Sequence, residues 1–227
     1  MRSRDHITRR SFLATLGATA ASLACAPTVN ARMGVRRLRR VGVQLYSLRD
    51  DARRDLSRTL GHEQMIVASL PIRGTPTLDD YRRWADRLNV AARQARTRDM
   101  WIGFHNHATD FKLVDGAVPY DLLMDRTDPS LLHHQLDTGN LAMAGRDPLD
   151  YLKRYNSRYW SFHIKDVPRL GADHDVELGT GVIDFKRLLA SVDDIDRKHF
   201  FVEQETYPGT PLESVRKDYT YLSRLEF

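Results

Sequence analysis

Short runs of apolar residues recur along the chain from Val41 onward, and each run is followed by a segment with helical periodicity. The apolar runs predict strands at Val41–Ser47, Gln64–Leu70, Met100–His105, His133–Asp137, Tyr159–His163 and His199–Glu203. They are nearly continuous rather than alternating, which is typical of strands that are buried on both faces of a parallel sheet.

The segments between these runs predict helices. The clearest is Leu78–Arg98, where Thr77 and Asp80 form the pattern of a capping box and apolar residues mark one face. Further helices are predicted at Asp51–Leu60, Pro119–Arg126, Pro148–Tyr155, Asp184–Ser191 and Leu212–Arg224. The alternation of strand and helix predicts an α/β protein, either a barrel or a doubly wound sheet. No glycine-rich phosphate fingerprint follows a predicted strand, which disfavours dinucleotide binding.

The first 31 residues differ from the rest of the chain. Arg9 and Arg10 precede an uncharged stretch, Phe12–Ala26, that is shorter than the roughly 20 residues of a membrane span. Val29-Asn30-Ala31 offers the small residues that a signal peptidase recognises. We therefore expect residues 1–31 to be a twin-arginine export signal and the mature protein to be periplasmic, without a membrane span. A lipoprotein signal at Cys25, the single cysteine, is the alternative.

The charge is also uneven along the chain. The net charge is +5 overall, but residues 32–40 alone contribute five arginines, which predicts a basic linker. From Val41 to the carboxyl end, 26 basic and 29 acidic residues give a net charge of −3. A mildly acidic folded part argues against a nucleic-acid partner.

Polar residues follow the later predicted strands where apolar packing does not require them. In a parallel barrel the carboxyl ends of the strands meet at one rim, so His105, Asp137, His163 and Glu203 are expected to face a common point. Two imidazoles and two carboxylates are ligands suited to one Mn²⁺, Co²⁺, Fe²⁺ or Zn²⁺ ion. Each residue taken alone also has an ordinary structural explanation, because Asp-Thr-Gly-Asn sequences often form turns.

Six segments together resemble the sugar phosphate isomerase/epimerase family, which has a xylose-isomerase-like barrel. They are VGVQLYSLRDD at 41–51, GFHNH at 103–107, QLDTGN at 135–140, FHIKD at 162–166, LGTGVIDF at 178–185 and FVEQE at 201–205. Family members hold one divalent metal ion with side chains of their last four strands, and the resemblance implies the same four ligands here. In many relatives the first ligand is a glutamate that also moves protons. His105 stands in its place, so a two-glutamate proton shuttle is not implied.

The resemblance also predicts an incomplete barrel. Family barrels have eight strands, whereas the pattern predicts six, and the predicted helix Asp51–Leu60 runs almost directly into the strand at Gln64. The second and third β/α units therefore have no counterpart. Cleavage after Ala31 would leave 196 residues, fewer than the ~250 of a typical barrel. We expect a single domain over residues 41–227, an open arc of six strands whose edges are exposed unless a partner or the basic linker covers them.

The resemblance implies a metal-dependent isomerase or epimerase that acts on a keto-sugar through an enediolate. Glu203 is the candidate base, and His105, His107 and Lys165 are candidates for the group that returns the proton. Lys165 is alternatively a group that stabilises negative charge on the substrate. Other polar residues expected to line a substrate pocket, or else to cap and pack the rim, are Gln44, Tyr46, His107, Asn140 and Arg169.

Other functions stay open at this point. The same scaffold supports a dehydratase or lyase of keto-sugars or inositol derivatives, and a degenerate barrel would bind sugar without catalysis. An endonuclease of the same barrel type would need more metal ligands and a basic face, which the charge from Val41 onward disfavours. The expected partner is a small sugar substrate, and a homo-oligomer is left open.

Overall fold

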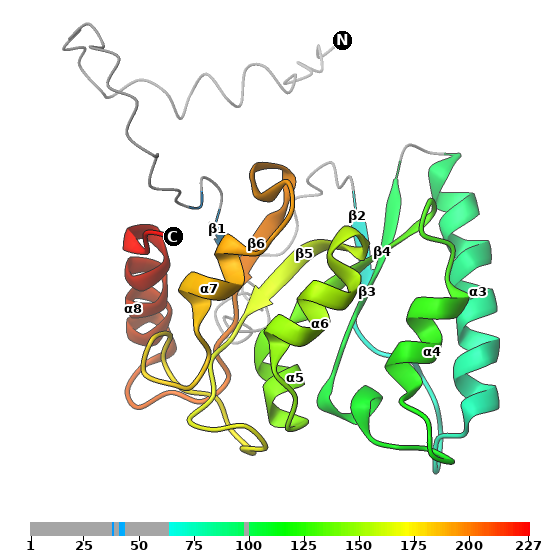
Figure 1. Ribbon diagram of the computed structural model, residues 1–227, viewed down its shortest axis with the longest axis horizontal. Helices are drawn as coiled ribbons and strands as arrows, with labels where there is room; N and C mark the ends of the chain where they lie inside the picture. The colour runs from blue at the N-terminus through cyan, green and yellow to red at the C-terminus, as the bar shows by residue number, and fades with distance from the viewer. Residues whose placement is uncertain (1–37, 39–40, 44–63, 98–99) are drawn as a thin grey trace, which may run out of the picture. The chain divides into compact units, whose positions relative to one another are not determined.

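The computed structural model describes Leu38 and residues 41–43, 64–97 and 100–227 (Figure 1). The predicted export signal and, except for Leu38, the predicted basic linker lie outside the described residues, as do Gln44, Tyr46 and the predicted helix Asp51–Leu60. Among the helices that are described, none combines the length and the apolar character that a bilayer crossing requires.

In the part of the chain that the structure describes, six parallel strands form one sheet in the order β1-β6-β5-β4-β3-β2. They are β1 (Val41–Val43), β2 (Gln64–Val67), β3 (Trp101–His105), β4 (Leu132–Asp137), β5 (Tyr159–Ile164) and β6 (His199–Val202). β1 and β2 are neighbours in the chain yet lie at opposite ends of this order. The predicted open arc of six strands, an incomplete barrel, is confirmed.

The helices follow the strands as the alternating pattern predicts. They are α3 (Leu78–Arg96), α4 (Pro119–Arg126), α5 (Thr138–Met143), α6 (Pro148–Tyr155), α7 (Phe185–Ala190) and α8 (Pro211–Arg224). The described residues also include three short 3₁₀ helices, which are η2 (Ala108–Phe111), η3 (Asn156–Arg158) and η4 (Ile195–Arg197). In Figure 1, α3 and α4 run side by side at one end of the sheet, and α8 packs near β1 and β6 at the other.

Helix α3 shows how local chemistry sets a boundary. The Thr77 hydroxyl accepts a hydrogen bond from the Asp80 backbone N–H at 3.2 Å, and the Asp80 carboxylate accepts one from the Thr77 N–H at 2.9 Å. This capping box satisfies two of the free N–H groups of the first turn. The helix ends at Arg96, two residues earlier than predicted, because Thr97 already caps it.

Several other strands and helices begin or end one residue from the predicted positions, and two differences are larger. β2 ends at Val67 rather than Leu70, because Leu70 accepts a backbone hydrogen bond from Ile72 in a turn that contains Pro71. The segment that begins at Thr138 forms α5, a helix that the pattern did not predict. The Asp137 carboxylate accepts a hydrogen bond from the Asn140 N–H at 2.7 Å and so caps this helix.

Alternation along the strands separates a core face from a polar face. Phe104, Leu136 and Phe162 are fully buried in the apolar core, and the rings of Phe162 and Phe200 stack with centroids 5.0 Å apart. The residues that follow Phe104, Leu136 and Phe162 point to the opposite face of the sheet, because successive side chains of a strand alternate. The register that pairs Asp137 with His163 brings these polar residues to one level at the carboxyl end of the sheet.

Candidate metal centre

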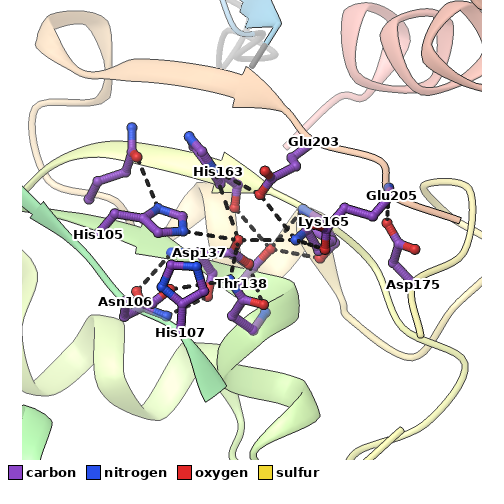
Figure 2. Close-up of polar contacts among 12 residues, drawn as sticks. His105, Asn106, His107, Asp137, Thr138, His163, Lys165, Asp175, Glu203 and Glu205 are labelled. Carbon is purple, nitrogen blue, oxygen red and sulfur yellow. Dashed lines mark hydrogen bonds and ion pairs between the residues drawn. The ribbon is translucent and has the colours of Figure 1, made fainter. Parts of the chain in front are cut away.

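The four predicted ligands lie together at the carboxyl ends of β3, β4, β5 and β6. One ligand atom from each of His105, Asp137, His163 and Glu203 lies within 4.8 Å of every other, and all four residues are buried. Figure 2 shows the four side chains converging from separate strands. Two nitrogen and two oxygen donors at this spacing suit a divalent transition metal ion. We call these four residues the ligand cluster.

A second side chain orients His105. The Gln135 amide oxygen lies 3.0 Å from His105 Nδ1, and the Gln135 amide nitrogen donates to the Ser161 hydroxyl at 3.1 Å. This arrangement places the His105 proton on Nδ1 and leaves Nε2, 3.7 Å from the Asp137 carboxylate, with its lone pair toward the cluster. A partner of this kind is typical of histidines that bind metals.

Asp137 is held by two asparagines. The Asn140 side-chain amide donates to Asp137 Oδ2 at 2.8 Å, in addition to the backbone hydrogen bond that caps α5. Asn106 brackets the Asp137 backbone, accepting from its N–H at 2.9 Å and donating to its carbonyl oxygen at 3.2 Å. The carboxylate therefore has a fixed orientation before any ligand binds.

Lys165 contributes a buried positive charge beside the cluster. Its ammonium lies 3.4 Å from the Asp137 carboxylate, 3.0 Å from that of Glu203 and 2.9 Å from that of Glu205, and the side chain is 1% exposed. Burial opposes this charge, but the three carboxylates together hold the pKa of Lys165 above its ordinary value. Lys165 is therefore a cation and a hydrogen-bond donor at neutral pH, and not a base.

The backbone around Lys165 is equally constrained. The Thr138 hydroxyl accepts from the Lys165 N–H at 3.0 Å and donates to the Lys165 carbonyl oxygen at 2.8 Å. Gly139 packs directly on the aliphatic part of the Lys165 side chain, and a Cβ at Gly139 would overlap it. Position 139 therefore requires glycine if the ammonium is to stay where it is.

Burial sets the protonation of the histidines. It lowers the pKa of His105 to about 3, with the nearby His163 ring adding to the effect. It also lowers the pKa of His163 to about 4, against the attraction of the Asp137 charge. Both imidazoles are thus neutral at pH 7, the form in which histidine binds a metal ion.

The charge balance also suits a divalent cation. With neutral imidazoles, the carboxylates of Asp137, Glu203 and Glu205 face the single ammonium of Lys165. Asp137 and Glu203 are buried whereas Glu205 is 40% exposed, and one dication would balance the excess of two negative charges. Burial raises the pKa of Asp137, and the nearby charge of Glu203 adds to this effect against the attraction of Lys165.

The other predicted site residues have different positions. The His107 ring lies beside His105 with centroids 4.9 Å apart and is half-buried at the edge of the cluster. Asn140 holds Asp137, as described above. Arg169 is exposed, and its guanidinium contacts the carbonyl oxygens of Leu170 and Gly171 in its own loop, so the described contacts do not bring it to the cluster.

Several residues around the cluster were not singled out from the sequence. Gln135 and Thr138 flank Asp137 within the QLDTGN segment, Glu205 follows Glu203 in FVEQE, and Asn106 lies in GFHNH. The sequence feature that could have identified them is their position in the same short polar segments as the predicted ligands. Asp175, which holds the backbone after β6, lies in the connection between β5 and α7 and carried no such signal.

Comparison with known proteins agrees with the fold. The model of a family described as xylose isomerase-like TIM barrel matches residues 50–225. Curated relatives include an inosose dehydratase of Bacillus cereus (strain AH820), 30% identical over 179 residues, and one of Lacticaseibacillus casei, 30% identical over 165 residues. These matches cover 69% and 64% of this chain but only 59% and 55% of the relatives.

Solved structures show the same fold. A sugar phosphate isomerase/epimerase from Parabacteroides distasonis ATCC 8503 superposes with a TM-score of 0.63 at 25% identity, covering 72% of this chain and 59% of that one. An IolI protein described with a bound zinc atom superposes with a TM-score of 0.57 at 17% identity, covering 71% and 62%. The resemblance inferred from the sequence is confirmed, and since the family model spans most of the chain, the protein belongs to the xylose isomerase-like TIM barrel family.

Proposed function

We propose that the protein is a metal-dependent dehydratase that removes water from a keto-inositol or a related keto-sugar. The observation that carries this proposal is the buried ligand cluster with an ammonium group in contact with two of its carboxylates. The choice of dehydration is supported by the curated relatives named inosose dehydratase. The sequence resemblance had favoured an isomerase or epimerase and had left dehydration as the alternative.

His105, Asp137, His163 and Glu203 would hold the metal ion. When bound, a divalent cation would polarise the substrate carbonyl and acidify the adjacent C–H bond. The proposed base is Glu203, whose carboxylate takes that proton and leaves an enediolate. Lys165 stabilises the negative charge that develops on the substrate oxygen, a role supported by its buried and permanently charged ammonium.

Elimination then breaks the bond between the β-carbon and its hydroxyl group. The electron pair of the enediolate forms the new C=C bond, and the hydroxyl leaves as water with a proton from a nearby acid. His107 is the proposed acid, supported by its half-buried position beside His105. The enol that remains rearranges to a diketone, so no oxidant or reductant is needed.

An isomerase or epimerase is the second candidate, favoured by the solved sugar phosphate isomerase/epimerase at 25% identity. It would share the proton abstraction and the enediolate but would return the proton instead of expelling the hydroxyl. The two functions therefore differ only in the product.

The test uses the protein with Mn²⁺ or Co²⁺ and a keto-inositol in deuterated water. We expect mass spectrometry to show that the substrate loses one water in a metal-dependent reaction. Glu203→Gln should lower the rate of this reaction at least about 100-fold. Glu177→Gln, which removes a glutamate paired with Lys217 on α8, is the matched control and should retain activity. Deuterium exchange at the α-carbon without loss of water would support the isomerase instead. The absence of both reactions would contradict both functions.

We also propose that the protein acts in the periplasm. The support is the pair Arg9-Arg10 ahead of the apolar stretch Phe12–Ala26. Cell fractionation of the full chain should find the processed protein in the periplasm, and replacing both arginines by lysine should retain it in the cytoplasm. Unchanged export of that variant would contradict the twin-arginine route.

A further inference from the structure

The Lys165 ammonium contacts two kinds of carboxylate. Those of Asp137 and Glu203 belong to the ligand cluster, whereas that of Glu205 does not. The closest of the three contacts is the one with Glu205, at 2.9 Å. The Glu205 side chain is 40% exposed while the two ligand carboxylates are buried, so Glu205 lies on the solvent side of the ammonium.

Glu205 is itself held in place by a buried acid. Asp175 accepts hydrogen bonds from the backbone N–H groups of Glu205 and Thr206, at 2.6 and 2.7 Å, one on each carboxylate oxygen. Asp175 is 1% exposed, and the next residue, Val176, bonds to the Asp166 backbone at the end of β5. The backbone that carries Glu205 is thus anchored to the segment after β5 that carries Lys165. Figure 2 shows Asp175 beside Glu205.

This geometry creates competition for the same oxygen atoms. Asp137 Oδ2 and Glu203 Oε2 face the ammonium, and the same two carboxylates belong to the ligand cluster. An ammonium paired only with them would repel a dication and occupy its ligands. A third carboxylate outside the cluster gives the ammonium a partner that the metal ion does not need.

We propose that Glu205 is a positioning residue that holds the Lys165 ammonium beside the ligand cluster, so that Asp137 and Glu203 remain available to the metal ion. The inference rests on the metal site of the proposed function. It assigns Glu205 a role that acts through Lys165 and not through direct contact with the metal.

The test is a double-mutant cycle on metal affinity, measured by Co²⁺ titration of the full chain. Glu205→Gln should weaken Co²⁺ binding about 10-fold, the usual effect of losing a partner of the ligand shell. Lys165→Met should tighten binding about 10-fold, because it removes the competing cation. In the Lys165→Met background the effect of Glu205→Gln should fall below about 3-fold, since the two residues act as one unit. Glu205→Asp should restore part of the affinity.

Two controls keep the cycle interpretable. Glu177→Gln breaks a Glu–Lys contact of the same length, 2.9 Å, between the connection after β5 and Lys217 on α8, and should leave Co²⁺ affinity unchanged. If Lys165→Met does not fold, Lys165→Gln keeps a polar group at the buried site and replaces it in the cycle.

The outcomes separate this inference from the proposed function. If Glu205→Gln lowers the Co²⁺ affinity equally in the unsubstituted protein and in Lys165→Met, Glu205 acts as a general negative charge. That result would overturn the positioning role even if dehydration is found. The expected coupling without dehydration would leave the positioning role intact and contradict only the proposed activity. No Co²⁺ binding by the unsubstituted protein would overturn the inference.

Discussion

Asp218 on α8 is a carboxyl group that the protein encloses completely. Its Oδ1 accepts a hydrogen bond from the Leu178 N–H at 2.8 Å, whereas Oδ2 is buried with no hydrogen-bond partner in the described part of the structure. Burial raises the pKa of Asp218 to about 7, and the charges of Glu177, Asp175 and Asp166 add to this against the Leu178 hydrogen bond. The folded protein therefore holds a proton here that the unfolded chain releases near pH 4.

A raised pKa in the folded state has a definite sign for stability. Asp218 contributes about 2–4 kcal/mol to the free energy of unfolding below about pH 4, and this contribution is lost as the pH rises through about 7. Asp218→Asn removes this titration, so the variant should be more stable than the unsubstituted protein at pH 8 and similar to it at pH 4. Urea denaturation across this range measures the difference. The exposed Asp193→Asn serves as the control, and a difference independent of pH would contradict the prediction.

At the scale of elements, the connection between β5 and α7 is organised by one carboxylate. Asp166 accepts hydrogen bonds from the backbone N–H groups of Val167, Gly179, Gly181 and Ile183, at 2.9–3.2 Å. A Cβ at Gly181 would overlap the Asp166 carboxylate, which explains the glycine there. Since this connection also carries Asp175, its fold determines where the backbone after β6 lies.

Asp166→Asn should destabilise the protein by about 2–4 kcal/mol. The amide nitrogen that replaces one carboxylate oxygen cannot accept the hydrogen bonds that this oxygen accepts from backbone N–H groups. Thermal unfolding and limited proteolysis should show lower stability and earlier cleavage between residues 167 and 184. Asp184→Asn is the matched control in the same connection, since asparagine caps a helix about as well as the Asp184 that caps α7. Equal stability of the two variants would contradict the central role of Asp166.

For the described domain as a whole, the ligand cluster joins four strands, so a bound metal ion would link most of the sheet. Mn²⁺, Co²⁺ or Zn²⁺ at about 100 times its dissociation constant should stabilise the folded state by about 2.7 kcal/mol. For a domain of this size the melting temperature should rise by about 5–10 °C, and a chelator should reverse the change.

His163→Ala should abolish this metal-induced shift, whatever its own melting temperature, because it removes one of four ligands. His174→Ala is the control, since His174 is exposed and contacts only Asp173 among the interactions described for it. A shift of equal size in both variants would show that the metal ion binds elsewhere.

The sequence by itself determined the order of the described strands and helices and the strand ends at which the four residues of the ligand cluster lie. Apolar runs, capping residues and helical periodicity act over a few neighbouring positions, so the elements that they produce can be predicted from the sequence. This is why α4 and α6 begin and end where predicted and why six parallel strands were expected. The same local logic did not reveal α5, because Asp137 and Asn140 fit a turn and a helix cap equally well.

Only the tertiary structure decided what surrounds the ligand cluster. Gln135 meets His105, Glu205 meets Lys165 and Asp175 meets the backbone of Glu205 across 30–40 residues of sequence. Such contacts depend on strand register and on the course of a long connection, and a shift of one residue in a strand would turn each side chain to the other face. Local patterns carry no information about these distances, so the charges that meet around the cluster became visible only in three dimensions.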